Sequence, residues 1–209
     1  MNNSLSRQIM LSVLGLAILI VAVVGVSYAI FVTTLTGTKE NEITTGTISM
    51  SFVEKNDGIS ITNALPMSIS EGKKLSGANN VYDFVVSSAI AGVTTVNYEV
   101  VAEKIEFQDK EKLSDKSVKL YLQKKENNKF KDTVITSIPR SFTPDLEISE
   151  LGSPAEGMIL YKGEFVNDST EKQSFNEYFR LRMWLADDAI IDEVSRSFKV
   201  RISVYGKVL

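Results

Sequence analysis

The sequence YFRLRMWL at residues 178–185 alternates between polar and apolar side chains with a period of two. Successive side chains of a β-strand point to opposite faces, so this pattern predicts a strand with one apolar face. The stretch FKVRISVY at residues 198–205 alternates in the same way. Strands of this kind bury one face against a core and are typical of antiparallel sheets. The apolar positions are Phe179, Leu181, Met183, Leu185, Phe198, Val200, Ile202 and Val204.

Weaker strand signals recur through the preceding part of the chain. No long amphipathic helix separates them, and only residues 68–71 and 108–116 show short helical patterns. Many short strands without intervening helices predict an all-β fold, here an antiparallel β-sandwich of the jelly-roll kind at residues 47–209. Residues 130–154 carry three of the four prolines and predict a long crossing loop. The further strands are predicted at residues 47–53, 59–62, 82–87, 93–103, 118–124 and 158–166.

Residues 9–32 form an apolar run that predicts a transmembrane helix or a signal peptide. At 1.5 Å per residue such a helix spans roughly 36 Å, enough for a hydrocarbon core about 30 Å thick. Arg7 is the only charged side chain before the run, whereas the charges just after it, at residues 39–42, are mostly acidic. The positive-inside rule therefore predicts a cytoplasmic stub at residues 1–8 and an exported C-terminal domain.

The end of the apolar run has the features of a signal-peptidase site. Ser27 and Ala29 are small residues at the two positions that a signal peptidase inspects, and cleavage after Ala29 would leave Ile30 as the new N-terminus. The run is also longer than that of most signal peptides, and long enough to remain as an anchor. Two alternatives therefore stay open: a secreted protein, and a membrane-anchored protein whose domain faces outside.

The composition argues against an enzyme. The chain has no histidine and no cysteine, which excludes a Ser-His-Asp triad, a Cys-His pair and the ordinary zinc sites. The formal net charge is −3, and the basic residues are dispersed among acidic ones, so no nucleic-acid partner is expected. We expect no catalytic residues, no bound metal and no cofactor, and a domain held together by its core without disulfides.

The segment at residues 33–46 is rich in threonine and predicts an extended tether or arm. If the leader is cleaved, the freed arm has apolar side chains that could seat in a neighbouring subunit as a donated strand. These side chains are Ile30, Phe31, Val32 and Leu35. The alternative is a simple membrane exit and spacer. The expected partners are accordingly the membrane and other protein subunits, including further copies of this chain.

The polar face of the strand at residues 178–185 is a candidate binding platform. It carries Tyr178, Arg180, Arg182 and Trp184. Aromatic rings beside arginines could bind a carbohydrate or a peptide, although such side chains also pack against a second sheet or cover a sheet edge. Both interpretations remain open at this stage.

Two polar motifs lie in predicted loops. Asp187, Asp188 and Asp192 could bind calcium through carboxylate oxygens, but their spacing matches no EF-hand and also fits a solvated loop. The sequence Asn167-Asp168-Ser169 satisfies the glycosylation sequon, and we interpret it as an ordinary turn between strands.

The junction between the apolar run and the first strand resembles a known family. The stretches Ser27-Tyr28-Ala29-Ile30-Phe31 and Ile43-Thr44-Thr45-Gly46-Thr47-Ile48-Ser49-Met50-Ser51 are similar to the start of the TasA/camelysin family of exported proteins of Gram-positive bacteria. Ile43 stands in place of an aromatic residue, and Ser49 in place of the usual acid. The resemblance covers roughly residues 5–52. Residues 65–66, 82–86 and 97–100 resemble the family's second region.

This resemblance implies a jelly-roll-like sandwich, removal of the leader by a dedicated signal peptidase and a role at the cell surface. TasA-like members build extracellular matrix fibres in which the mature N-terminal segment of one subunit completes the sheet of the next. Camelysins have been classed as surface metallopeptidases, an activity that does not carry over to a chain without histidine. We therefore predict a non-enzymatic structural protein of the cell surface or matrix. The alternative is an anchored, monomeric binding or adhesion module, and a hydrolase is the class we expect least.

Intact mass and N-terminal sequencing of the protein from its native host distinguish secretion from anchoring. Cleavage predicts a mature chain that begins at Ile30, which would justify a search for fibres by electron microscopy. An intact N-terminus in the membrane fraction would identify an anchored module. That result would also contradict strand donation, because the arm would never be freed.

Overall fold

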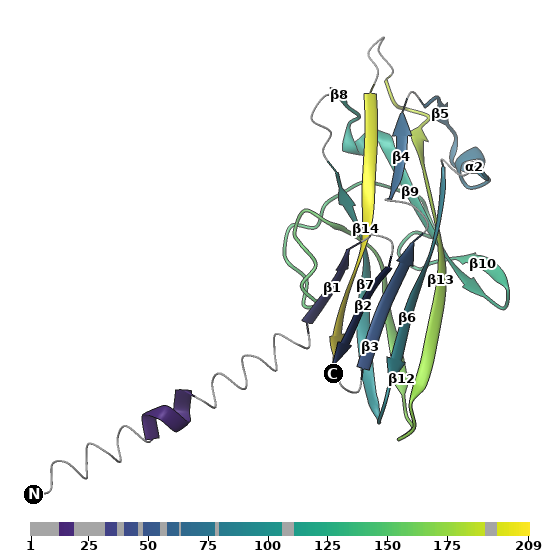
Figure 1. The fold of residues 1–209 in the computed structure, drawn as a ribbon. Helices are drawn as coiled ribbons and strands as arrows, with labels where there is room; N and C mark the ends of the chain where they lie inside the picture. The colour runs from purple at the N-terminus through teal and green to yellow at the C-terminus, as the bar shows by residue number, and fades with distance from the viewer. Residues whose placement is uncertain are drawn as a thin grey trace, which may run out of the picture.

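A computed structural model describes residues 13–18, 32–36, 40–45, 48–54, 58–62, 64–77, 80–105, 111–190 and 196–209. Most of these residues belong to two β-sheets whose strands pair mainly antiparallel (Figure 1). The inner faces of the sheets share one core. The ring centroids of Tyr161 and Phe179, which come from different sheets, lie 5.1 Å apart. The predicted antiparallel, all-β sandwich is therefore confirmed.

The first sheet has six strands and contains the first and the last strand of the domain. The strands are β1 (Val32–Thr36), β4 (Ile59–Thr62), β7 (Thr94–Lys104), β8 (Glu111–Lys112), β12 (Met158–Asn167) and β14 (Arg196–Val208). Their order is β1-β14-β7-β12, and β4 and β8 also pair with β14. β12 therefore lies at one edge of this sheet.

The second sheet has eight strands. They are β2 (Glu40–Thr45), β3 (Ile48–Glu54), β5 (Pro66–Met67), β6 (Val81–Ile90), β9 (Val118–Glu126), β10 (Lys129–Asp132), β11 (Arg140–Ser141) and β13 (Gln173–Ala186). Their order is β10-β9-β13-β6-β3-β2, with β11 also on β9 and β5 also on β13. Two short helical turns accompany the sheets, α2 (Ile69–Gly72) and the 3-10 turn η1 (Asp115–Ser117).

The two stretches with the clearest alternation form the two longest strands, β13 and β14. Phe179, Leu181 and Met183 of β13 are buried in the core, as their period of two predicts. The last residues of β13 are buried on both faces, because α2 packs over this end of the strand. Alternation along one strand reports which face is apolar, but not whether another segment covers the polar face.

The segment at residues 33–46, predicted as a tether, contributes an edge strand to each sheet. β1 pairs with β14, so that Val32 lies opposite Lys207 and Thr36 lies opposite Ser203. β2 pairs with β3, and β1 also contacts β2 and β3. The described strands of the sandwich therefore include residues 32–36 and 40–45, ahead of the predicted first strand at residues 47–53.

Residues 133–157 contain only the two-residue strand β11 and otherwise form a long loop. The backbone N–H of Asp145 donates to the carbonyl oxygen of Gly157 at 2.7 Å. The Asp145 carboxylate accepts a hydrogen bond from the N–H of Ile159 at 3.0 Å. These two bonds hold the loop against the beginning of β12.

Most of the apolar run at residues 9–32 lies outside the described residues. Residues 13–18 within it are helical. In the part of the chain that the structure describes, no helix is both long and apolar enough to cross a bilayer. The predicted cleavage residues Ser27, Ala29 and Ile30 also lie outside the described residues, as does Phe31.

Replacement of Gly72 tests how tightly α2 packs on β13. A Cβ atom at Gly72 would lie 2.1 Å from the ring of Trp184, and this ring is buried. Gly72→Ala should therefore lower the free energy of unfolding by about 1–3 kcal/mol, the usual cost of overpacking. Denaturant unfolding of the full chain in detergent, followed by fluorescence of its single tryptophan, measures the change.

Gly77→Ala is the matched control, because the nearest atom to its added Cβ is 3.8 Å away. Equal stability of the two variants would contradict the packing described for α2.

Candidate functional site

The predicted platform on β13 is divided between the surface and the interior. Tyr178 is 47% exposed, and the Lys125 ammonium lies 5.5 Å from the centroid of its ring. The Arg180 guanidinium forms two 2.7 Å bonds to the Asp83 carboxylate and lies 4.2 Å from the centroid of the Phe130 ring. The bonds to Asp83 raise the pKa of Arg180, so this side chain remains charged and fixed.

The other two platform residues are covered by the segment that contains α2. Trp184 is 1% exposed beneath Gly72. Arg182 is 9% exposed, and its Nε donates to the carbonyl oxygen of Leu75 at 2.8 Å. Only Tyr178 and Arg180 reach solvent, so the four residues do not form one exposed platform.

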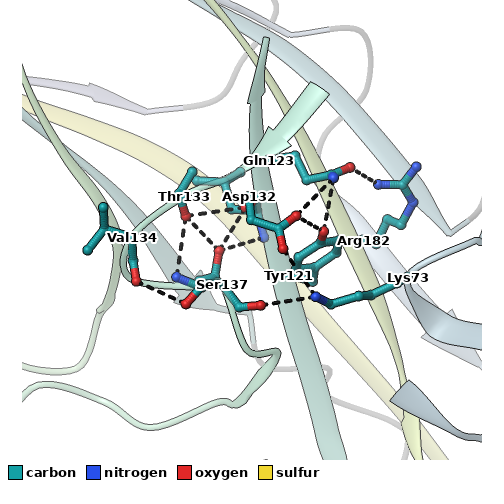
Figure 2. Close-up of polar contacts among 10 residues, drawn as sticks. Lys73, Tyr121, Gln123, Asp132, Thr133, Val134, Ser137 and Arg182 are labelled. Atoms are coloured by element: carbon teal, nitrogen blue, oxygen red, sulfur yellow. Dashed lines mark hydrogen bonds and ion pairs between the residues drawn. The ribbon is translucent and has the colours of Figure 1, made fainter. Parts of the chain in front are cut away.

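Arg182 also belongs to a polar network on the outer face of the second sheet (Figure 2). Its guanidinium donates to the side-chain oxygen of Gln123, and the Gln123 amide donates to the Tyr121 hydroxyl at 2.9 Å. Tyr121 in turn donates to Asp132, which pairs with Lys73 at 3.2 Å. We call these five residues the outer-face network.

The outer-face network joins three parts of the fold. Lys73 follows α2, Asp132 ends β10, and the remaining members lie on β9 and β13. Burial opposes ionisation of Asp132, but its hydrogen bonds from Tyr121, Lys73 and Gln123 outweigh burial and lower its pKa. Each of the five side chains is hydrogen-bonded to another member, and Lys73 and Arg182 also donate to backbone carbonyl oxygens. The network therefore holds α2 and β10 on the sheet.

The structure describes part of the predicted calcium-binding turn and all of the glycosylation sequon. Asp187 and Asp188 are exposed just after β13, whereas Asp192 lies outside the described residues. Among the described residues, no three His, Cys, Asp or Glu side chains are placed to hold a metal ion. The buried Asn167 amide donates to the carbonyl oxygens of Ile90 and Glu171 at 2.9 Å, so it closes the turn between β12 and β13.

A groove of about 1120 Å³ lies beside β12, and sequence reasoning did not predict it. Residues 159 and 161–164 of β12 line it, together with residues 97–99 of β7. Lys124 of β9 and Glu177 of β13 form the opposite wall, and the loop at residues 145–151 forms the rim. The groove therefore opens between the two sheets at the β12 edge.

Four polar side chains cross the gap between the sheets at the floor of this groove. The Lys124 ammonium lies 2.8 Å from a Glu177 carboxylate oxygen and donates to the Tyr161 hydroxyl at 2.9 Å. The Tyr98 hydroxyl donates to the same Glu177 oxygen. Tyr98 and Tyr161 belong to the first sheet, Lys124 and Glu177 to the second. We call these four residues the inter-sheet quartet.

The protonation states in the quartet follow from its partners. Burial and the neighbouring Glu177 carboxylate raise the pKa of the Tyr98 hydroxyl far above its ordinary value, so this hydroxyl remains a donor. Burial disfavours the charged form of Lys124, but hydrogen bonds to Glu177 and Tyr161 outweigh burial and raise its pKa. The quartet is thus a charged, fully bonded bridge rather than a reactive centre.

The alternation of β13 and β9 places two charged members of the quartet at core-facing positions. Glu177 occupies the same inward register as Phe175 and Phe179, and Lys124 occupies the register of Leu120 and Leu122. A charged residue at a core-facing position requires a partner there, because an unpaired buried charge is costly. Its partner cannot be identified without knowing which strands are neighbours.

No protein-family model and no curated protein sequence matches this chain. One similar solved structure is TmCBM61 in complex with β-1,4-galactotriose, with 9% identity and a TM-score of 0.23 over 75% of this chain and 86% of that one. Another is the GH31 α-xylosidase from Xanthomonas citri, with 9% identity and a TM-score of 0.16 over 84% of this chain and 22% of that one. Likeness at this level carries no argument about function.

Asp132→Asn tests the outer-face network through the pH dependence of stability. The pKa of Asp132 is lower in the folded state than its ordinary value of 3.8, so the ionised carboxylate stabilises the fold. This stabilisation is complete above pH 3.8 and is lost as the pH falls through the pKa of the folded state. The variant has no carboxyl group there to titrate. The difference in unfolding free energy between the native chain and Asp132→Asn should therefore be largest near neutral pH and shrink below about pH 4.

Unfolding curves at a series of pH values measure this difference. Asp168→Asn, in the exposed turn after β12, is the control for removal of one surface carboxylate. The same pH dependence in both variants would contradict the role given to Asp132.

Proposed function

We propose that this protein is an exported structural protein of the cell surface or extracellular matrix, related to the TasA/camelysin family, which assembles through its N-terminal strand. The observation that carries the proposal is the position of β1. This strand begins at Val32, the last residue of the apolar run, lies at the edge of the first sheet and pairs there with the C-terminal strand β14. A strand in this position can be supplied equally well by another copy of the chain.

The physical basis is that backbone pairing does not distinguish between chains. The bonds between β1 and β14 involve only main-chain groups, so a donated β1 satisfies the same donors and acceptors on β14. β1 has only five residues, so its own pairing can be exchanged without unfolding the rest of the sandwich. Exchange of an identical element between protomers is a common route to assembly.

Features of the apolar run support export. The run at residues 9–32 is long enough to span a bilayer, and the apolar side chains of its helical part at residues 13–18 are exposed. Cleavage after Ala29 would release Ile30, Phe31 and the strand β1 as a free N-terminal segment. The protein would then be secreted, from a cell of the Gram-positive type, as a jelly-roll-like subunit.

The second candidate function is that of a membrane-anchored binding module, favoured by the groove beside β12. The groove has a volume of about 1120 Å³ and is lined by charged side chains together with Tyr98, Tyr161, Leu146 and Ile148, so it has both the space and the polar groups to take a ligand. In this case the apolar run would be retained, and β1 would remain paired with β14 of its own chain. Strand exchange between chains therefore distinguishes the two functions.

Cysteine cross-linking tests the exchange directly. Thr36 and Ser203 are register partners on β1 and β14, and directly opposed antiparallel residues lie close enough for a disulfide. The native chain has no cysteine, so every cross-link can be assigned. Co-expression of chains carrying Thr36→Cys with chains carrying Ser203→Cys should give disulfide-linked dimers in material assembled in the native host.

The control pair is Ser87→Cys and Asn176→Cys, register partners on β6 and β13 in the middle of the second sheet. This pair should cross-link within a chain when both changes are combined, and never between singly substituted chains. Absence of mixed dimers from Thr36→Cys and Ser203→Cys in assembled material would overturn the proposal.

A further inference from the structure

The long strand β12 lies at the end of the first sheet, whereas the long strand β9 of the second sheet has further strands along its outer side. β9 is covered along its edge by β10 and β11. Between them, the Thr136 hydroxyl accepts from the N–H of Leu122 at 3.0 Å and donates to its carbonyl oxygen at 2.8 Å. β12 pairs only with β7 among the described strands, and the loop protects only its beginning, at Ile159.

The groove follows this open edge. Tyr161, Lys162, Gly163 and Glu164 are consecutive residues of β12, so they face alternate sides of the strand, and all four line the groove. A pocket on one face would be lined by alternate residues only. The groove therefore exposes the backbone edge of β12, where unpaired N–H and C=O groups of an edge strand are available to another chain.

The charge of the groove is predominantly negative. Six carboxylates line it, against two lysines. Lys124 pairs with Glu177, and Lys162 pairs with Glu99 at 3.0 Å. The other four carboxylates have no ion pair with any described residue: Asp145, Glu147, Glu150 and Glu164. The unbalanced charge favours a cationic ligand.

The rim of the groove adds apolar contacts. Leu146 is 95% exposed and Ile148 is 72% exposed, and both lie in the loop that lines the groove. They alternate along the loop with Glu147 and Ser149. An extended peptide presents its side chains with the same period of two, so it can place basic and aliphatic side chains opposite matching partners.

We propose that the β12 edge binds an extended segment of another protein, rich in lysine or arginine alternating with aliphatic residues, as an added antiparallel or parallel strand. Main-chain bonds to β12 supply affinity, the carboxylates of Glu147, Glu150 and Glu164 select the basic side chains, and Leu146 and Ile148 contact the aliphatic ones. This inference goes beyond the assembly through β1, because it concerns the opposite end of the strand order and a different partner.

The test uses the full chain in detergent and a fluorescent octapeptide of alternating lysine and valine. We expect saturable binding that weakens with added salt, and slower amide hydrogen exchange at residues 160–166 when the peptide is present. Glu147→Gln combined with Glu150→Gln should weaken binding by about threefold to tenfold, the effect of removing two exposed ion pairs. Glu156→Gln combined with Glu171→Gln, two exposed acids outside the groove, is the matched control and should leave binding unchanged.

Two further probes separate strand addition from simple charge attraction. The same octapeptide with N-methylated amides keeps its charge but loses its donors, so it should bind far more weakly. A glucosamine tetramer is also cationic but has no peptide backbone, and should not protect residues 160–166. Equal binding of the methylated peptide, equal loss in both double variants, or no change in exchange on β12 would each overturn the proposal.

Discussion

Hydrogen bonding at the sheet edges is the constraint on which the rest of this structure depends. A sandwich of two open sheets leaves unpaired main-chain groups along its edge strands, and such edges pair with other chains unless they are protected. This chain protects its edges in different ways. β1 and β4 share one edge of β14, β2 covers β3, and two short strands with one threonine cover β9. Among the described strands, β12 is a ten-residue strand at the end of a sheet, and it lies beside an acidic groove.

Between the sheets, the inter-sheet quartet must likewise satisfy polar groups that are partly removed from water. Near the β12 edge the half-buried side chains of a lysine and a glutamate lie beside aromatic rings, where partial removal from water makes an unpaired charge costly. Lys124 and Glu177 satisfy one another, and the hydroxyls of Tyr98 and Tyr161 complete the set. Removing one member would leave another without its partner, which costs more than replacing the whole set by apolar residues. The quartet therefore fixes how the two sheets meet at this edge.

The sequence predicts the sandwich because alternation along β13 and β14 is a local property of each strand. It does not predict which segments cover a polar face: Trp184 lies at a position that alternation makes exposed, and α2 buries it. The same limit applies to β1, whose threonine-rich sequence is compatible with a spacer and with an edge strand. The groove depends on which distant strands are neighbours, so the sequence shows only the inward register of Glu177 and Lys124 and not that the two side chains meet.

The start of β1 at Val32 has a consequence for the timing of assembly. The apolar run ends at the same residue, so no spacer separates it from the first strand of the sandwich. Under the function proposed above, a retained run would hold the β1 edge beside the bilayer, where a second subunit would have little access to it. Proteolytic release would then determine when strand exchange can begin, as well as whether the subunit is secreted.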